Sequence, residues 1–332
     1  MTILLNEQQV KSLISVSDIN EIVDKTFIDF GMNKVINPTK ITLDLGETGN
    51  WPQYEGFMNA MPAYVNWLDV AGQKWVGGFA GKRKEAGLPY ITALIQLIDP
   101  RMGTFTAVMD GAYISNMRTG SQAANALKYL GKKDSITIGM YGAGLQARKA
   151  VMSIADLFEI DRLVVWNHRR VTAEKFKEDM QTYVQGNFII ADPEHPEQAA
   201  NNEALFTFTP AQKPFLTKDM VKPGTIVFPM GSFEEVTEDL ILAADKIIVD
   251  HVEQALHRGV LKPLTQSGKI TKENIHSTLG ELAANKVKLD DISNEIIVCI
   301  PIGTGALDVA VAEVVRQRAL EQGVGTHFDF SQ

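Results

Sequence analysis

The sequence predicts an α/β protein in which a Rossmann-type, doubly wound parallel sheet is joined to a second domain of α+β structure. Two observations lead to this fold class. First, a glycine-rich turn at Gly142–Gly144 directly follows an apolar, β-branched run and directly precedes good helix formers. Second, strand-like and helix-like segments alternate after Ser135, whereas the chain before Gly111 carries short strand-like segments separated by turns.

The composition is that of a globular protein of about two domains. The chain has 332 residues, of which 45% are hydrophobic and 22% are charged, so a large core can form. The net charge of -8 argues against a nucleic-acid surface, which needs clustered positive charge. The sequence shows no secretory signal and no apolar run of the roughly 18 residues that span a membrane. We therefore expect a cytoplasmic protein.

The first domain begins with a helical region from Leu5 to Gly31, in which Ser17 or Asp18 is expected to cap a helix. Short strand candidates follow at 41–43, 68–70, 75–76, 90–98 and 104–109, which indicates a largely antiparallel sheet. A long helix is expected from Ala112 to Leu130, where Gly131 ends it.

The second domain is expected to hold the parallel sheet. Strand candidates lie at 135–141, 162–166, 187–190, 204–208, 225–228, 246–249 and 295–300, with helical stretches among them. A final helix, Leu307 to Gln322, is expected to return to the first domain. The predicted boundaries are thus 1–115 plus 306–332 for the first domain and 116–305 for the second.

The glycine turn is a candidate dinucleotide site. Its residues Gly142, Ala143, Gly144, Leu145 and Gln146 open a G-x-G-x-x-A motif between a strand and a helix. Glycines let the backbone approach a pyrophosphate, and the free N–H groups of the helix N-terminus bind its negative charge.

The end of the second parallel strand bears on which dinucleotide binds. An acidic residue usually stands there and binds the adenosine ribose. This sequence instead has Asn167, Arg169 and Arg170, and a guanidinium suits a phosphate. The pattern favours NADP(H) over NAD(H), although Asn167 also suits NAD(H), and both arginines also fit a solvated helix start.

Three cations stand out as candidates for binding a substrate carboxylate. Lys74 lies in an apolar strand-like segment, Arg118 on a helix of small, neutral residues, and Lys40 at the start of a strand. A surface charge is the simpler reading of each. No metal site is expected, because His251 and His257 are six residues apart rather than the three or four that align two ligands on a helix face.

Several motifs, in the right order over nearly the whole chain, resemble the ornithine cyclodeaminase/mu-crystallin family. They are M-P-A at 61–63 with Lys74, R-T-G-S at 118–121, G-A-G-L-Q-A at 142–147, L-G-E-L-A-A-N-K at 279–286 and G-T-G-A-L-D at 303–308. The family consists of NAD(P)-dependent enzymes of amino acids and their imines. It is dimeric, and its first domain, completed by the C-terminal helix, supplies both the substrate site and the dimer interface.

The resemblance implies a role for each matching residue. Lys74 corresponds to the catalytic lysine and Arg118 to the arginine that contacts the substrate carboxylate, while Lys40 stands where most members have an arginine. Met58 is expected to contact the substrate as well. The remaining expected cofactor contacts are Thr119, Thr209, Met230 and Gly231, in addition to the glycine turn and Asn167, Arg169 and Arg170.

One departure from the family pattern bears on the reaction. Cyclodeaminases carry an acid after a late Rossmann strand, and Phe233 takes its place here. Lys82 and Tyr90 also replace usual residues, so the pocket is remodelled. Mu-crystallin-type ketimine reductases lack the same acid. We therefore expect an NAD(P)H-dependent ketimine reductase or amino-acid dehydrogenase, with a cyclodeaminase and a non-enzymatic NADPH-binding protein as alternatives.

Overall fold

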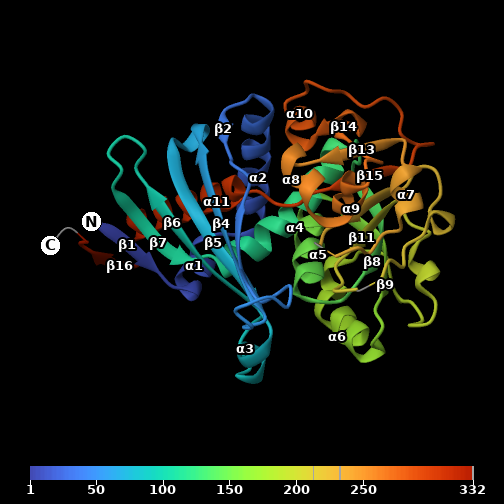
Figure 1. Ribbon diagram of the computed structural model, residues 1–332, viewed down its shortest axis with the longest axis horizontal. Coiled ribbons are helices and arrows are strands. Elements are labelled where there is room, and N and C mark those ends of the chain that lie inside the picture. Colours follow the sequence, from blue (N-terminus) through green and yellow to red (C-terminus); the bar gives the residue numbers. More distant parts are fainter. Residues whose placement is uncertain (212, 232, 331–332) are drawn as a thin grey trace. The chain divides into compact units, whose positions relative to one another are not determined.

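The protein separates into two compact units, each built on one eight-stranded sheet (Figure 1). The structure is a computed structural model that describes residues 1–211, 213–231 and 233–330. Unit 1 comprises Met1–Arg118 and Thr304–Gln332, and unit 2 comprises Thr119–Gly303. The expected fold class is confirmed, because the sheet of unit 2 is parallel throughout and that of unit 1 is mixed.

Unit 1 orders its strands β16-β1-β7-β6-β5-β4-β2, and β3 pairs with β4. Its strands are β1 (Thr2–Leu5), β2 (Val35–Ile36), β3 (Ile41–Leu45), β4 (Gly56–Val65), β5 (Val70–Phe79), β6 (Ile91–Ile98), β7 (Phe105–Asp110) and β16 (Thr326–Phe328). Its helices are α1 (Glu7–Leu13), α2 (Val16–Gly31), α3 (Gly81–Glu85) and α11 (Gly305–Gln322), and α4 (Ala112–Tyr129) begins in this unit.

The strand β4 is a central element that the sequence analysis missed. It pairs with β5 over ten residues and alternates between a buried and a half-buried face. Pro62 fits inside it because β3 pairs only up to Ala60 and β2 only from Tyr64, so the proline lies in a gap of the ladder.

The N-terminal prediction was wrong in two details. The helix α2 is capped by Ser15, whose side chain accepts from the Asp18 amide, while the Asp18 carboxylate accepts from the Ser15 amide. Ser17 and Asp18 therefore lie inside the helix. The expected strand at 68–70 begins only at Val70, because Asn66–Leu68 form a 3-10 turn and Asp69 has a φ of 46°.

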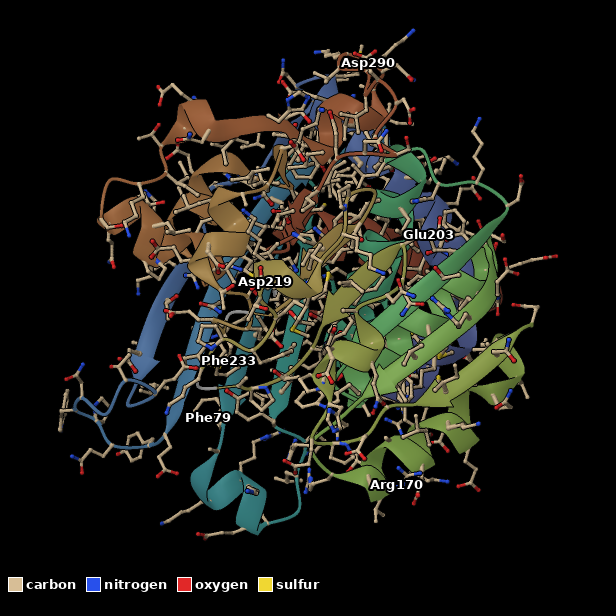
Figure 2. The ribbon with its side chains drawn as sticks, turned by 90° about the vertical axis from the view of Figure 1, so that its right-hand side faces the viewer. Phe79, Arg170, Glu203, Asp219, Phe233 and Asp290 are labelled. Atoms are coloured by element: carbon tan, nitrogen blue, oxygen red, sulfur yellow. The ribbon has the colours of Figure 1, made fainter. Side chains whose placement is uncertain are left out.

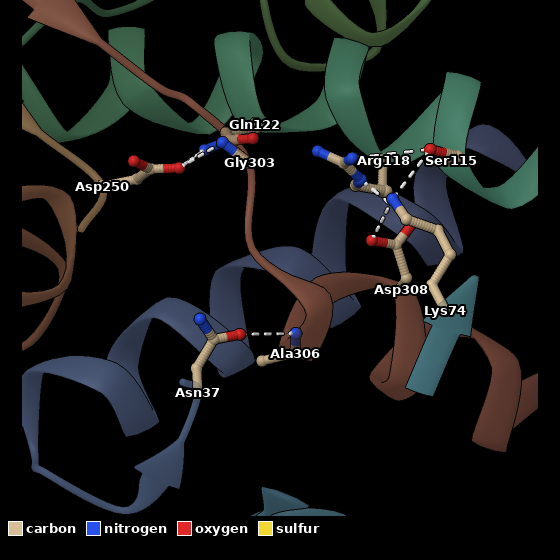
Figure 3. A network of polar contacts seen from close by, with 9 residues as sticks. All are labelled: Asn37, Lys74, Ser115, Arg118, Gln122, Asp250, Gly303, Ala306 and Asp308. Atoms are coloured by element: carbon tan, nitrogen blue, oxygen red, sulfur yellow. Dashed lines mark hydrogen bonds and ion pairs between the residues drawn. The ribbon is translucent and has the colours of Figure 1, made fainter. Parts of the chain in front are cut away.

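The C-terminal helix α11 packs on one face of the unit 1 sheet, as predicted. In register, Met61 of β4, Lys74 of β5 and Ile95 of β6 stand side by side, and all three are buried. Gly305 begins α11 against β4, where an added Cβ would meet the Met61 carbonyl oxygen at 2.4 Å. The next residue, Ala306, donates its amide to Asn37 Oδ1 at 3.1 Å (Figure 3). These contacts fix the first turn of α11 over the sheet.

Unit 2 has the strand order β10-β9-β8-β11-β12-β15-β13-β14. The strands are β8 (Ser135–Tyr141), β9 (Glu159–Trp166), β10 (Asn187–Ile190), β11 (Ala204–Thr207), β12 (Ile226–Pro229), β13 (Lys246–Val249), β14 (Ile275–Thr278) and β15 (Ile297–Ile300). The helices are α5 (Leu145–Leu157), α6 (Arg170–Met180), α7 (Glu238–Leu242), α8 (Val252–His257), α9 (Lys262–Gln266) and α10 (Leu279–Ala283). The strand order reverses between β8 and β11, which is where ligands bind in open α/β sheets.

Candidate active site

The glycine turn of unit 2 is shaped for a close backbone approach. Gly142 follows β8 with a φ of 100°, and a Cβ there would meet the Phe208 carbonyl oxygen at 2.6 Å. A Cβ on Gly144 would instead project into open space, with nothing within 4 Å. Gly144 is the N-cap of α5 and gives that helix no side-chain cap, so the first-turn amides suit a phosphate group.

Arg148 in α5 binds the carbonyl oxygens of this turn. Its guanidinium donates to the carbonyl oxygens of Ala143 and Gly144 and to Asp179 Oδ2 at 2.9 Å. It also lies 5.1 Å from the ring centre of Phe176 in α6. The turn is thus attached to α6 through its carbonyl oxygens and to β9 through the Gly142 amide, which donates to the Trp166 carbonyl at 2.9 Å.

The remaining expected cofactor residues of unit 2 lie on segments next to the turn or at strand ends. Thr119 precedes Gly120, where an added Cβ would meet the Lys149 carbonyl oxygen of α5 at 2.3 Å. Thr209 follows β11, and Met230, which donates its amide to the Thr207 carbonyl, follows β12 together with Gly231.

The end of β9 carries the residues expected to select the dinucleotide. Asn167 is buried and donates Nδ2 to the Arg169 carbonyl at 2.9 Å, which shapes the turn into α6. Arg169 is exposed at the N-cap of α6. Arg170 is exposed too (Figure 2), and its Nε lies 3.1 Å from Glu174 Oε1 in an i,i+4 pair. Exposed guanidinium groups at this strand end can reach a phosphate from solvent.

The central feature of unit 1 is a buried cluster of charges. Lys74 Nζ lies 2.6 Å from Asp308 Oδ2, and Arg118 Nε lies 3.1 Å from Asp308 Oδ1 (Figure 3). Both cations also donate to Ser115 Oγ, at 3.0 and 3.4 Å. Lys74 is 1% exposed and Asp308 is fully buried. We call these four residues the Lys74 cluster.

The sequence explains how this cluster forms. Lys74 stands directly opposite Met61 and Ile95 in the sheet, so all three side chains point to the same face, the one that α11 covers. Ser115 and Arg118 are three residues apart on α4 and so share a helix face. Asp308 lies in the first turn of α11, which Gly305 fixes over β4.

The cluster lowers the proton affinity of Lys74. Burial is the main cause, the charge of Arg118 adds to it, and Asp308 opposes both, which leaves the pKa of Lys74 at about 8 instead of 10.5. Two cations share the Asp308 carboxylate, so the four residues of the cluster carry a formal charge of +1 away from water when Lys74 is protonated. A buried surplus of this kind favours an anionic ligand.

The structure brings Lys74 and Arg118 together but separates Met58 from them. Because side chains alternate along a strand, Met58 lies on the opposite face of β4 from Met61. A Cβ on its partner Gly77 would meet Met58 Sδ at 2.3 Å. Met61, rather than Met58, is therefore the methionine of β4 that stands beside Lys74. Lys40 is half-buried just before β3.

Asp308 and Ser115 are the members of the cluster to which the sequence analysis gave no role. Asp308 ends the G-T-G-A-L-D segment, and a carboxylate inside the otherwise apolar run at 305–312 was the available signal. Ser115 left no signal beyond its i,i+3 spacing from Arg118.

Among the described residues, no group of three or more His, Cys, Asp or Glu is placed to hold a metal ion. Over the same ranges, the helices are too short or too polar to cross a membrane.

Comparison with known proteins gives a consistent result. The ornithine cyclodeaminase/mu-crystallin family profile matches residues 1–323. The chain is 32% identical to an alanine dehydrogenase of Archaeoglobus fulgidus over 332 residues, covering 99% of this chain and 98% of that protein.

Two solved structures are similar along their whole length. One is an archaeal alanine dehydrogenase dimer with bound NAD, at 31% identity and a TM-score of 0.89, with 99% of each chain covered. The other is the Δ1-pyrroline-2-carboxylate reductase of Thermococcus litoralis in complex with NADH and L-proline. It has 27% identity and a TM-score of 0.88, and the match covers 98% of this chain and 100% of that one.

Proposed function

The chain belongs to the ornithine cyclodeaminase/mu-crystallin family, and we propose that its Lys74 cluster holds an amino acid or imine by the carboxylate. The class of reaction is oxidoreduction at a CH–NH2 or C=N group of an amino acid or imine with a nicotinamide cofactor. The bound nicotinamide supplies or accepts the hydride. The observation that carries the proposal is the buried, net positive Lys74 cluster in a chain that also has the glycine turn.

Arg118 is proposed to bind the substrate carboxylate. Asp308 accepts from its Nε, which fixes the plane of the guanidinium, and the planar fork of an arginine suits a charge-assisted pair with a carboxylate. Lys40 is proposed to add a second positive charge at the same carboxylate, as the family resemblance implies. An anion here neutralises the surplus charge, so its binding offsets the free energy needed to bury two cations beside one carboxylate.

Lys74 is proposed to move the proton that accompanies hydride transfer. In the direction of reduction, its ammonium donates a proton toward the substrate nitrogen; in the direction of oxidation, the neutral amine takes that proton back. A pKa of about 8 makes both forms accessible near neutral pH. Asp308 and Ser115 hold Nζ in place through contacts of 2.6 and 3.0 Å, so the proton is exchanged at a fixed position.

We propose NADP(H) as the preferred dinucleotide. The support is the pair of exposed guanidinium groups of Arg169 and Arg170 at the end of β9, where an acidic residue would favour NAD(H). The two similar solved structures hold NAD and NADH, so the preference needs a direct measurement.

Arg169→Ala is expected to weaken NADPH binding at least fivefold and leave NADH binding within twofold. An equal effect on both would remove the proposed preference.

We also propose a homodimer formed through the outer face of the unit 1 sheet. Ile41, Ala60, Trp75 and Leu94 stand in one cross-strand row on the face opposite Lys74, and three of them are exposed apolar side chains. A groove of ≈ 400 Å³ on the same face is lined by residues such as Tyr64, Gln96 and Phe105. An apolar sheet face of this size is costly to leave in water, and a second copy can cover it.

The dimer has a simple test. Trp75→Glu puts a charge in the middle of the row and is expected to give a monomer in light scattering after size-exclusion chromatography. Trp51→Glu is the matched control, because Trp51 is 89% exposed and lies in the loop between β3 and β4 rather than in a strand. A dimer that survives Trp75→Glu would contradict this assignment of the interface.

The proposed function is tested by a substrate panel with both cofactors. Purified wild type and Lys74→Met are assayed with pyruvate plus ammonium and with cyclic α-imino acids for reduction. Alanine, proline, ornithine and lysine are the substrates for oxidation. We expect turnover of at least one pair by wild type and a loss of at least 10³-fold in Lys74→Met, with cofactor binding kept. Full turnover by Lys74→Met would exclude Lys74 as the proton-transfer group.

The same panel separates the two alternatives. A cyclodeaminase would release ammonia and form proline from ornithine with no net change in cofactor, and Phe233 in the acid's place argues against that chemistry. A binding protein would bind NADPH and turn over nothing in the panel.

A further inference from the structure

Unit 2 contains a buried carboxylate that no step above uses. Glu235 is fully buried in the loop after β12, although its neighbour Glu234 is exposed. Its Oε2 accepts from Thr207 Oγ1 at 2.7 Å. Its Oε1 accepts from Thr209 twice, from the amide at 2.6 Å and from Oγ1 at 2.7 Å. Among the described residues, no lysine, arginine or histidine forms an ion pair with it.

The backbone of Glu235 binds the same neighbouring loop. Its carbonyl oxygen accepts from the amides of Phe215 at 3.0 Å and Leu216 at 3.1 Å. Side chain and backbone together therefore hold both ends of the segment between β11 and Leu216. A loop with this many bonds to one residue depends on that residue for its position.

The start of that segment, Phe208 and Thr209, packs directly on the glycine turn. A Cβ on Gly142 would lie 2.6 Å from the Phe208 carbonyl oxygen and 3.2 Å from Thr209 Cγ2, and the Phe208 amide donates to the Tyr141 carbonyl at 2.8 Å. On its other side, Glu235 Oε2 lies 3.2 Å from the position of a Cβ on Gly231. Glu235 thus connects three residues of the proposed cofactor site: Thr209, Gly142 and Gly231.

We propose that Glu235 is a positioning residue that sets dinucleotide affinity by holding the Thr207–Thr209 segment against the glycine turn. A carboxylate supplies the acceptors for three donors at once, which a shorter or apolar side chain cannot do. Burial raises the pKa of Glu235 while its hydrogen bonds oppose that rise, so the protein keeps this acid in an unfavourable environment. The proposed role of Glu235 is to position the loop, not to contact the dinucleotide.

The inference rests on the proposed cofactor site, and a binding experiment without substrate separates the two. Dissociation constants for NADH and NADPH are measured by calorimetry for wild type, Glu235→Ala, Glu235→Gln, Thr207→Val and the control Glu234→Gln. Melting temperatures are measured without ligand. If wild type binds neither dinucleotide, the proposed function fails rather than the role of Glu235.

We expect Glu235→Ala to weaken binding of both dinucleotides at least tenfold. Glu235→Gln should stay within about threefold of wild type, because its amide oxygen still accepts from Thr209 and Thr207 Oγ1 can turn to accept from its NH2. Thr207→Val, which is nearly isosteric, should weaken binding about threefold, and it replaces the alanine variant if that variant does not fold. Glu234→Gln should bind like wild type.

Two results would overturn the inference. The first is wild-type affinity in Glu235→Ala or, if that variant does not fold, in Thr207→Val, even with a lower melting temperature, because Glu235 would then only stabilise the fold. The second is a glutamine variant as weak as the alanine variant, because accepting hydrogen bonds would then not be its role.

Discussion

The two units bury their carboxylates in opposite ways. Asp308 of unit 1 lies between two cations, Lys74 and Arg118, and the group as a whole is positive. Glu235 of unit 2 has only neutral partners, two threonine hydroxyls and one amide. A carboxylate between two cations fixes those cations in position for a further anion, whereas one held by neutral donors positions the backbone and side chains that donate to it. This contrast supports the two proposed roles, anion binding by the Lys74 cluster of unit 1 and loop positioning by Glu235.

Removing the anion of the Lys74 cluster should have the largest effect. Asp308→Asn leaves two buried cations facing each other, and we expect it to lower the free energy of unfolding by about 3–5 kcal/mol. Urea denaturation measures this change. Glu321→Gln is the control, because Glu321 is an exposed acid on the same helix. A loss under about 1 kcal/mol would mean that the cluster is not electrostatically coupled.

The next effect is the pH dependence of stability due to Lys74. Its pKa is about 8 in the folded protein and near 10.5 in the unfolded chain, so between these values the unfolded chain binds more protons. The contribution of Lys74 to the free energy of unfolding therefore rises by about 3 kcal/mol as the pH increases from 8 to 10.5. Lys74→Met lacks this contribution.

Urea denaturation of both proteins at several pH values tests it. Wild type should gain stability relative to Lys74→Met as the pH rises, and the difference cancels titrations that the two proteins share. A constant difference across this window would show that the pKa of Lys74 is not lowered.

Replacing the guanidinium of Arg118 with an ammonium group should have a smaller effect, on the KM for the substrate. Arg118→Lys keeps the charge but loses the fork that suits a carboxylate, so KM for the substrate should rise about tenfold. The dissociation constant for the cofactor should not change. Arg316→Lys, which alters an arginine paired with Glu313 on α11, is the control. An unchanged KM in Arg118→Lys would remove Arg118 from the carboxylate site.

The smallest effect should come from the neutral member of the cluster. Ser115→Ala removes an acceptor that Lys74 and Arg118 share, and we expect a loss of about 1 kcal/mol in unfolding free energy. Ser12→Ala, at an exposed serine, should cost less than half of that. Equal losses in the two variants would show that Ser115 contributes nothing to holding the cations.

Much of unit 2 could be predicted from the sequence because its strands are short apolar runs, and the central ones, β11, β12 and β15, are buried on both faces. β8, β10 and β13 begin and end at the predicted residues, since each is a short apolar run between polar segments. The missed edge strand β14 contains His276 and Ser277, which break the apolar pattern. Unit 1 was harder, because β4 alternates and contains Pro62, and β1 and β16 pair with partners far away in the sequence.

Site residues could be predicted where a single charge stands out from its sequence neighbours. They could not be predicted where strand register or contacts between distant segments determine which residues meet. Lys74 and Arg118 stood out as charges in apolar or neutral surroundings. That Met61 rather than Met58 stands beside Lys74 follows from the register of β4 against β5, which local sequence does not contain. Asp308 lies 190 residues after Arg118, and two adjacent glutamates look alike until burial distinguishes Glu235 from Glu234.

The pH dependence of the oxidation rate tests the central claim about Lys74 most directly. With amino acid well below its KM and with saturating cofactor, the rate reports kcat/KM and hence the pKa of Lys74 in the enzyme without amino acid. The neutral amine of Lys74 must accept a proton, so kcat/KM should rise with pH and level off above an inflection near 8. The same protein assayed for imine reduction should lose activity through that inflection, and any residual activity of Lys74→Met should lack it. Parallel profiles in both directions, or an inflection that persists in Lys74→Met, would contradict the account.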